Sequence, residues 1–194
     1  MTTTSREERC MMNLPNKLTV GRVIAVPFFI ALYMMGYYIP ALIVFIAASF
    51  TDLLDGKIAR KYNLVTNFGK IMDPLADKIL VYSAFCLMVG DGLIRAWILI
   101  IILAREFMMA GMRTVAASEG IVIAADMSGK IKTVLQMIAV PLLIFYRAVP
   151  QIPQIAQYER YVYLVAMGFL YASLFMTVYS GIEYIVKNKE VFRQ

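Results

Sequence analysis

Four aspartates lie close together in a chain that is otherwise apolar, and their carboxylates are the groups best suited to chemistry. They are Asp52, Asp55, Asp73 and Asp77. An unpartnered carboxylate at the margin of a lipid bilayer costs roughly 2.5 kcal/mol or more, so four together require compensating positive charge. Divalent cations supply that charge most economically. Because the surrounding segment has no Cys or His, its oxygen ligands favour Mg or Mn over zinc, and we expect two such cations.

The chain contains no histidine at all. Histidine is therefore excluded as general base and as metal ligand, which leaves carboxylates for that chemistry near neutral pH. Two neighbouring divalent cations bridge a pyrophosphate, neutralise its charge and stabilise both the attacking and the leaving oxygen. The aspartate stretch therefore indicates phosphoryl chemistry.

The first two aspartates are expected to lie on a helix. Asp52, Asp55 and Ala59 are spaced i, i+3 and i+7, which places them on one helical face. Gly56 and Ala59 keep that face small. We expect this face to lie near the cytoplasmic end of the second membrane span.

The other two aspartates are expected to begin the next helix. Pro74 suits the first helical position and Asp73 suits the position before it, so the spacing predicts a helix that starts at Asp73. Asp77 then lies on the same face, one turn deeper. Residues Lys61–Met72 are expected to form a short turn, in which Gly69 permits close approach of the backbone. The two helices would present four carboxylates across a gap.

The composition sets the surroundings in which these carboxylates act. The chain has 194 residues, of which 61% are hydrophobic and 16% charged, and its mean hydropathy is +0.70. With about 20 residues for each span, we expect an all-α integral membrane protein, a single domain over residues 1–194 that forms a bundle of six transmembrane helices. The spans are expected at Leu18–Tyr38, Pro40–Ala59, Pro74–Val89, Ala96–Ala117, Ile131–Val149 and Tyr161–Val186.

The distribution of basic residues predicts the orientation in the membrane. Of the 19 Lys and Arg residues, only Arg95, Arg147 and Arg160 fall toward one side of the predicted spans. By the positive-inside rule, both termini, the aspartate stretch and the loop Glu119–Gly129 face the cytoplasm of a multi-pass protein in the cell membrane.

The N-terminal segment, residues 1–17, lacks the apolar region of a cleavable signal peptide. Met11, Met12 and Leu14, followed by Pro15, are expected to form a short interfacial helix that lies on the membrane before the first span.

The aspartate stretch also resembles a known family signature. Written as D-x2-D-G-x2-A-R-x8-G-x3-D-x3-D, it is similar to the signature of the CDP-alcohol phosphatidyltransferases, with eight fixed positions over 26 residues. The matching residues are Asp52, Asp55, Gly56, Ala59, Arg60, Gly69, Asp73 and Asp77. The resemblance implies a metal-dependent enzyme whose donor lipid is typically CDP-diacylglycerol.

The resemblance also implies roles for single residues. Asp52, Asp55 and Asp73 correspond to metal ligands, and Asp77 corresponds to the base that removes a proton, a role compatible with metal contact. The CDP-lipid would lie against small residues of the helix, with Arg60 bound to phosphate or to the base edge. The residues implied in CDP-lipid binding are Asp52, Gly56, Ala59, Arg60 and Gly69.

Segments outside the signature resemble the phosphatidylglycerolphosphate synthases within this family. They are N-L-P-N-K-L-T-V-G-R from Asn13, A-R-E-F around Arg105, G-M-R-T around Arg113, and G-K-I-K-T-V-L-Q from Gly129. This likeness implies glycerol 3-phosphate as the acceptor and phosphatidylglycerol phosphate as the product of a phospholipid biosynthesis enzyme.

A phosphate-bearing acceptor needs a cationic pocket, for which the candidates are Arg113, Lys130, Lys132 and Arg105. An alternative to phosphate binding stays open for each. For Arg105 it is a buried structural pair with Glu106, and for the lysines it is a role as interfacial charges that extend to the membrane surface.

Other functions are also compatible with parts of the pattern. The same chemistry with another acceptor would give a cardiolipin synthase or an enzyme of the inositol-phosphate type. Intramembrane carboxylates also occur in metal-ion and proton transporters, but a second copy of the four-aspartate pattern is absent from the sequence. The family likeness favours a homodimer, and no nucleic-acid partner is expected.

Overall fold

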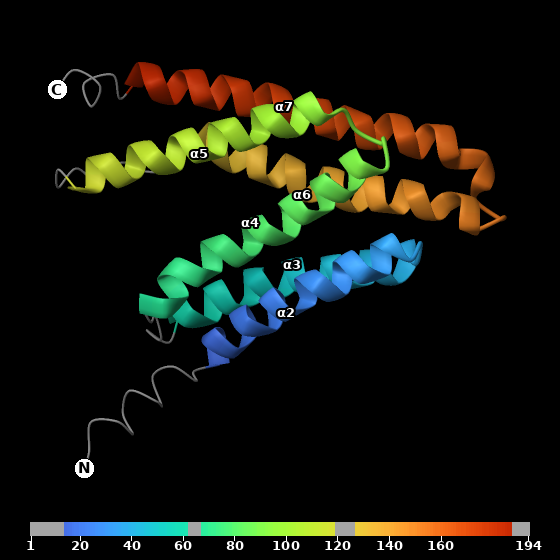
Figure 1. Ribbon diagram of the computed structural model, residues 1–194, viewed down its shortest axis with the longest axis horizontal. Coiled ribbons are helices and arrows are strands. Elements are labelled where there is room, and N and C mark those ends of the chain that lie inside the picture. Colours follow the sequence, from blue (N-terminus) through green and yellow to red (C-terminus); the bar gives the residue numbers. More distant parts are fainter. Residues whose placement is uncertain (1–13, 62–66, 119–126, 188–194) are drawn as a thin grey trace, which may run out of the picture. The chain divides into compact units, whose positions relative to one another are not determined.

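The computed structural model contains helices and no strand within the part of the chain that it describes. It describes the backbone of residues 14–61, 67–118 and 127–187, and the side chains of residues 21–51, 75, 78–118 and 127–187. The elements are α2 (Leu14–Met34), α3 (Tyr38–Lys61), α4 (Asn67–Gly90), α5 (Ala96–Ser118), α6 (Met127–Ala148), the short 3-10 helices η1 (Val149–Gln151) and η2 (Ala156–Tyr158), and α7 (Glu159–Lys187) (Figure 1). The all-α prediction is confirmed for these residues.

The predicted helix limits agree with the structure to within four residues, except at the start of α4. Helix α4 begins at Asn67, so the prediction of a start at Asp73 is wrong, and Pro74 lies inside the helix. Proline favours a first turn, but a helix tolerates it further along when neighbouring groups compensate for the lost backbone hydrogen bond. Helix α2 begins at Leu14, so Leu14 and Pro15 belong to the first long helix. The remainder of the predicted interfacial helix lies outside the described residues.

The chain divides into two compact units, Met1–Leu87 and Met88–Gln194. In the first unit, α2 and α3 pack against each other (Figure 1). A tight reversal joins them. Gly36 has φ of 79°, and its N–H donates to Tyr33 O while the N–H of Tyr37 donates to Leu32 O, at 3.0 and 2.9 Å. This Schellman geometry requires a residue in the left-handed region, which glycine adopts without a steric penalty.

Aromatic rings fill the contact between α2 and α3. Phe29 and Phe45 are both 0% exposed, and their ring centroids lie 5.7 Å apart. Tyr33 continues the cluster along α2, 6.1 Å from Phe29, and meets Tyr38 edge-on at 5.2 Å. The two helices are therefore held by large buried rings on facing surfaces.

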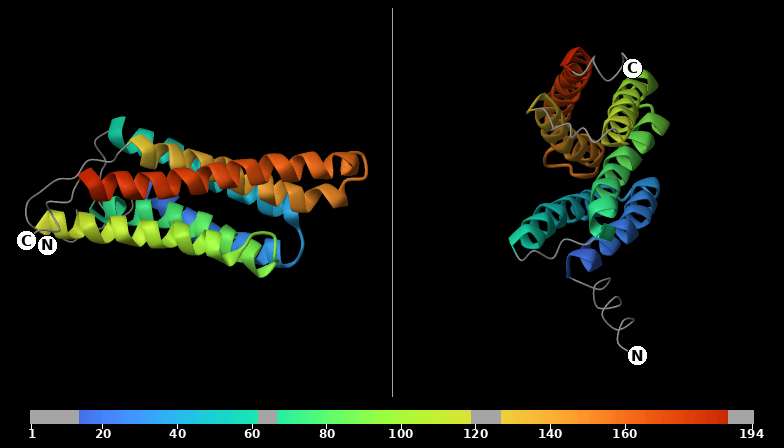
Figure 2. Two further views of the ribbon diagram at one scale, coloured as in Figure 1. Left: turned by 90° about the horizontal axis from the view of Figure 1, so that it is seen from above. Right: turned by 90° about the vertical axis from the view of Figure 1, so that its left-hand side faces the viewer.

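In the second unit, α6 packs along α7, and α5 also contacts α7 (Figure 2). The buried face of α6 past its midpoint is apolar, and Ala139, Val140, Leu143 and Ile144 are all 0% exposed. Helix α6 continues through Pro141 without interruption. The unit begins with a second Schellman turn, in which Gly92 has φ of 70° and the N–H of Leu93 donates to Met88 O at 2.9 Å.

Two stretches of the described residues are long and apolar enough to cross a membrane. They are Met127–Gln151 and Ala156–Lys187. Shorter apolar stretches of the described part lie in α2, α3 and α4, at Gly21–Met34, Tyr38–Thr51 and Lys78–Gly90. Together with the composition, these helices are consistent with a membrane protein.

The aromatic contact predicts a large difference between two adjacent phenylalanines. Phe29→Ala removes a fully buried ring, so we expect it to lower the free energy of unfolding by about 3–5 kcal/mol. Phe28 is 63% exposed, and Phe28→Ala should change the stability by less than about 1 kcal/mol. Thermal unfolding of the two variants in the same detergent compares them directly. Equal losses would contradict the packing described for α2 and α3.

Candidate active site

The aspartate stretch occupies two helices. Asp52 and Asp55 lie in α3, and Asp73 and Asp77 lie in α4. Because both stretches are helical, the i, i+3 spacing of the first pair and the i, i+4 spacing of the second place each pair of positions on one face of its helix. The side chains of all four lie outside those that the structure describes. Among the described residues, no three His, Cys, Asp or Glu side chains come together, so the metal site stays a prediction.

The predicted CDP-lipid residues also occupy these helices. Gly56, Ala59 and Arg60 lie in the last two turns of α3. Gly69 lies in the first turn of α4, so its predicted position in a connecting turn is wrong. The reason is that α4 extends six residues further toward its N-terminus than Pro74 indicated. The side chains at these positions lie outside the described set.

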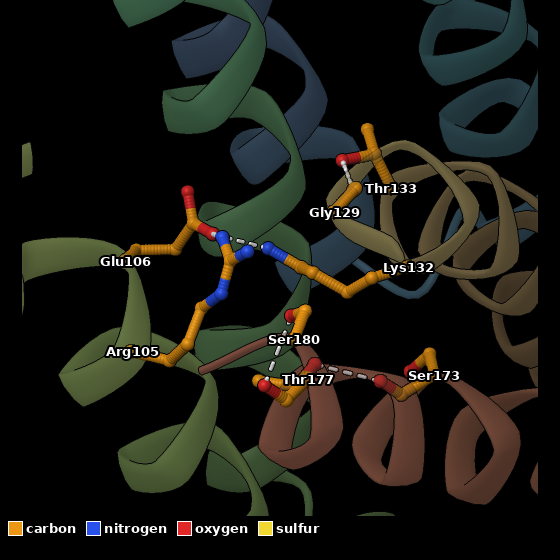
Figure 3. Close-up of polar contacts among 8 residues, drawn as sticks. All are labelled: Arg105, Glu106, Gly129, Lys132, Thr133, Ser173, Thr177 and Ser180. Carbon is orange, nitrogen blue, oxygen red and sulfur yellow. Dashed lines mark hydrogen bonds and ion pairs between the residues drawn. The ribbon is translucent and has the colours of Figure 1, made fainter. Parts of the chain in front are cut away.

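The basic candidates of the second unit are described, and two of them meet at one carboxylate. Arg105 and Glu106 come from α5 and Lys132 comes from α6 (Figure 3). Arg105 Nη1 donates to Glu106 Oε1 at 2.8 Å, and Lys132 Nζ donates to the same oxygen. The exposed fractions of the three side chains are 12%, 11% and 3%. We call these three residues the α5–α6 triad.

The described contacts bear on the alternatives that the sequence left open. The pairing of Arg105 with Glu106 is present in the structure. Lys132 does not extend to a surface, because it is almost fully buried against Glu106. A buried lysine of this kind needs a partner that stabilises its charge.

One member of the triad has an unused hydrogen-bond donor. An arginine has five N–H donors in a planar fork, and the buried Nε of Arg105 has no hydrogen-bond partner among the described residues. A guanidinium with an unused donor is suited to an oxyanion such as a phosphate.

Two glycines make room for the Arg105 side chain. A Cβ atom at Gly129 of α6 would lie 3.1 Å from Arg105 Nη2, and a Cβ atom at Gly181 of α7 would lie 3.4 Å from Arg105 Cγ. The first distance is shorter than an ordinary van der Waals contact, whereas the second is close to one. Arg105 therefore extends from α5 past positions on both neighbouring helices where a larger side chain would crowd it.

Buried hydroxyls line α7 near this junction, and the sequence reasoning missed them. Ser173, Thr177 and Ser180 are at most 1% exposed. Each hydroxyl donates to a backbone carbonyl of its own helix. Ser173 donates to Leu170 O at 2.7 Å. Thr177 donates to Ser173 O at 2.6 Å and Ser180 to Thr177 O at 3.1 Å (Figure 3). The signal for them was present, because small polar residues spaced four and three apart share one face of a helix. Small residues of this kind allow helices in a membrane to approach closely.

The two other basic candidates lie outside the triad. Arg113 of α5 and Lys130 of α6 are both exposed. Lys130 is two residues from Lys132, so it projects from a different face of α6. The structure therefore brings together Arg105 and Lys132, and it does not add Arg113 or Lys130 to their hydrogen bonds.

A separate pocket of about 430 Å³ lies where α6 leads into α7. It is lined by Tyr146, Ala156, Gln157, Glu159, Arg160 and Tyr163. Tyr146 follows Lys132 by 14 positions on α6, which corresponds to roughly 21 Å along the helix. None of the predicted site residues lines this pocket, so it is not the candidate active site.

Comparison with known proteins shows that the chain is similar to one family. The model of the CDP-alcohol phosphatidyltransferases matches residues 12–179. The chain is 41% identical over 198 residues to the CDP-diacylglycerol--glycerol-3-phosphate 3-phosphatidyltransferase of Bacillus subtilis (strain 168), covering 94% of this chain and 98% of the relative. It is 35% identical to the protein of the same name in Rickettsia typhi, covering 94% and 100%. It is 32% identical to a probable phosphatidylglycerophosphate synthase of Mycobacterium tuberculosis, covering 90% and 81%.

The triad predicts that replacing glutamate by glutamine lowers the stability of the protein more at position 106 than at position 183. Glu106→Gln leaves the cations of Arg105 and Lys132 without the carboxylate they share, so we expect the unfolding free energy to fall by about 3–5 kcal/mol. Glu183 pairs with the half-exposed Lys187 at 2.7 Å, and Glu183→Gln should cost less than about 1 kcal/mol. Denaturation of both variants in detergent gives the comparison. A Glu106→Gln protein as stable as Glu183→Gln would contradict the described pairing.

The glycine contact predicts that an alanine is less well tolerated at position 129 than elsewhere. Gly111→Ala, on α5, meets nothing within 4 Å and should stabilise the helix by up to about 1 kcal/mol. Gly129→Ala should be less stable than Gly111→Ala by about 1–2 kcal/mol, because the Arg105 guanidinium must move. Melting temperatures measure both. In an Arg105→Met background the difference should largely disappear, and its persistence there would argue against this contact.

Proposed function

The chain belongs to the CDP-alcohol phosphatidyltransferase family, and we propose that it transfers the phosphatidyl group of CDP-diacylglycerol to glycerol 3-phosphate, giving phosphatidylglycerol phosphate and CMP. The observation that carries this proposal is the 41% identity, over 94% of the chain, to the Bacillus subtilis relative named for that reaction. The aspartate signature lies within the matched residues 12–179. The unused Nε–H donor of Arg105, beside the cation of Lys132, supports an acceptor that carries a phosphate.

The donor set fits divalent cations. Four carboxylates occupy positions on one face of α3 and one face of α4, and a chain without histidine offers oxygen ligands, which suit Mg and Mn. Asp52, Asp55 and Asp73 would hold the cations, and Asp77 would also contact them. When bound, the cations neutralise the pyrophosphate of the donor and stabilise the departing phosphate of CMP.

Asp77 acts as the base in the proposed reaction. Its carboxylate takes the proton from the sn-1 hydroxyl of glycerol 3-phosphate. The resulting alkoxide attacks the β-phosphorus, which is the one next to the lipid. A new phosphorus–oxygen bond forms to the acceptor, and the bond between the β-phosphorus and the oxygen of CMP breaks, so that CMP leaves with the electron pair.

The remaining signature residues bind the donor. Gly56 and Ala59 are small, so the cytosine and ribose can lie against α3, and the Arg60 guanidinium binds phosphate or the base edge. Gly69, in the first turn of α4, permits a close approach of backbone to ligand. Asp52 belongs to this group as well as to the metal ligands.

The acceptor phosphate binds to basic residues of α5 and α6. Arg105 and Lys132 already converge on Glu106, and Arg113 and Lys130 are exposed on the same two helices. We assign the phosphate to these four residues, because several N–H donors on fixed helices bind a phosphate more strongly than one flexible charge.

The proposal places the enzyme in the cell membrane with six spans. Both termini and the active site face the cytoplasm, as the distribution of Lys and Arg indicates. A site at the cytoplasmic margin admits a water-soluble acceptor together with a two-tailed donor. The enzyme is proposed to act as a homodimer in the lipid bilayer.

The reaction is tested with purified protein, CDP-diacylglycerol and labelled glycerol 3-phosphate. We expect phosphatidylglycerol phosphate and CMP to form with Mg or Mn, and chelation of the cations to abolish both products. Asp77→Asn should lower kcat by at least about 100-fold, because an amide cannot accept the proton. Asp91→Asn is the matched control, because Asp91 pairs with Arg147 at 2.9 Å and lies outside the signature.

Three results would contradict the proposal. They are release of CMP without divalent cations, full activity of Asp77→Asn, and a product formed better from another acceptor. Phosphatidylglycerol as the preferred acceptor would make the protein a cardiolipin synthase, and an inositol phosphate would make it an enzyme of the inositol-phosphate type.

A further inference from the structure

Gln136 of α6 is a buried amide with an unused donor. The residue is 3% exposed, and its Nε2 has no hydrogen-bond partner among the described residues. A buried N–H group without a partner destabilises the folded protein, so natural proteins keep few of them. A bound ligand that completes the hydrogen bond is one explanation for such a group.

Gln136 ends a column of polar side chains on α6. Ser128, Lys132 and Gln136 follow one another at intervals of four, and all three are buried. Beyond Gln136 the buried face of α6 is apolar, beginning with Ala139 and Val140. The amide is therefore the innermost polar group of this column, one turn further into α6 than the lysine of the triad.

Helix α7 packs along α6, but its buried hydroxyls do not pair with the Gln136 amide. Gln136 Nε2 makes no hydrogen bond to Ser173, Thr177 or Ser180, or to any other described residue. The buried Nε of Arg105 is likewise without a partner among the described residues. Arg105 of α5 and Gln136 of α6 thus carry unused buried donors. Along α6 these donors lie on either side of Lys132, because the Arg105 guanidinium approaches Gly129.

The spacing of these donors suits a three-carbon phosphate ester. Gly129 and Gln136 are seven residues apart, so they lie on nearly the same face of α6 and are separated by roughly 10 Å along its axis. Helical side chains lean toward the N-terminus, which brings the Gln136 amide back toward Lys132. A ligand with its phosphate at Arg105 and Lys132 would therefore present its middle carbon near the amide.

We propose that Gln136 is a specificity-determining residue, whose Nε2 donates a hydrogen bond to the C2 hydroxyl of glycerol 3-phosphate while Arg105 and Lys132 hold the phosphate. This inference rests on the proposed function and adds to it the recognition of the middle hydroxyl. A buried donor discriminates strongly against an acceptor that lacks the matching oxygen, because the donor is then left unpaired.

The test pairs two acceptors with two variants. The acceptors are glycerol 3-phosphate and 3-hydroxypropyl phosphate, which lacks only the C2 hydroxyl. The wild type should prefer glycerol 3-phosphate by roughly 10- to 100-fold in kcat/KM. Gln136→Met keeps the length of the side chain and removes the donor, so the preference should fall to about 3-fold or less. The loss should fall on glycerol 3-phosphate, with the KM for CDP-diacylglycerol unchanged.

Matched controls separate this role from a structural one. Gln157→Met, at an exposed glutamine of η2, should keep the wild-type preference. Gln136→Leu provides a second variant without the donor, and both Gln136 variants should melt no lower than the wild type, because the unused buried donor is gone.

The outcomes distinguish the two proposals. Equal losses for both acceptors in Gln136→Met, or a wild type that does not discriminate between the acceptors, would overturn the role of Gln136 and leave the proposed function standing. A wild type that forms no product from glycerol 3-phosphate, while it uses CDP-diacylglycerol with another acceptor, would overturn the proposed function and this role with it.

Discussion

The second unit depends on the ion pairs that the Glu106 carboxylate makes. A charged group in an apolar helical bundle is stable only when it is paired, and Glu106 is paired twice, with Arg105 of its own helix and with Lys132 of α6. This pairing ties α5 to α6 at one position. The pairing also positions Arg105 beside Gly129 of α6, where a methyl group would lie 3.1 Å from its guanidinium. The position of Arg105 therefore limits side-chain size at this point of α6.

The same constraint connects stability with recognition. The shared carboxylate pairs with both buried cations, but the buried Nε of Arg105 has no described partner. The unused amide of Gln136 lies one turn further along α6. An interior optimised for stability alone would replace these groups with apolar side chains. Their retention on facing helices is the pattern expected of a site that binds a small, charged and hydroxylated molecule.

The sequence predicted the elements well where hydrophobic runs are bounded by polar residues. Helix α5 begins at Ala96 as expected and ends one residue past the predicted Ala117. The prediction failed at α4, because Pro74 was taken to mark the first turn, whereas the helix begins at Asn67. The preference of proline for the first turn reflects only the free-energy cost at that residue. A helix can extend through a proline when the rest of its backbone hydrogen bonds form. Gly69 was placed in a turn by the same reasoning.

The sequence by itself determined the reaction class, because the types and spacing of Asp52, Asp55, Asp73 and Asp77 restrict the chemistry before any fold is known. It also determined that helices carry them, since hydrophobic runs of that length form helices. The tertiary structure decided which basic residues are paired. Lys130 and Lys132 are the same residue type in the same segment of the sequence. Lys132 is nevertheless buried against Glu106, and Lys130 is exposed. That difference depends on which helix packs against which face, and contacts between residues 26 positions apart follow from packing and not from local pattern.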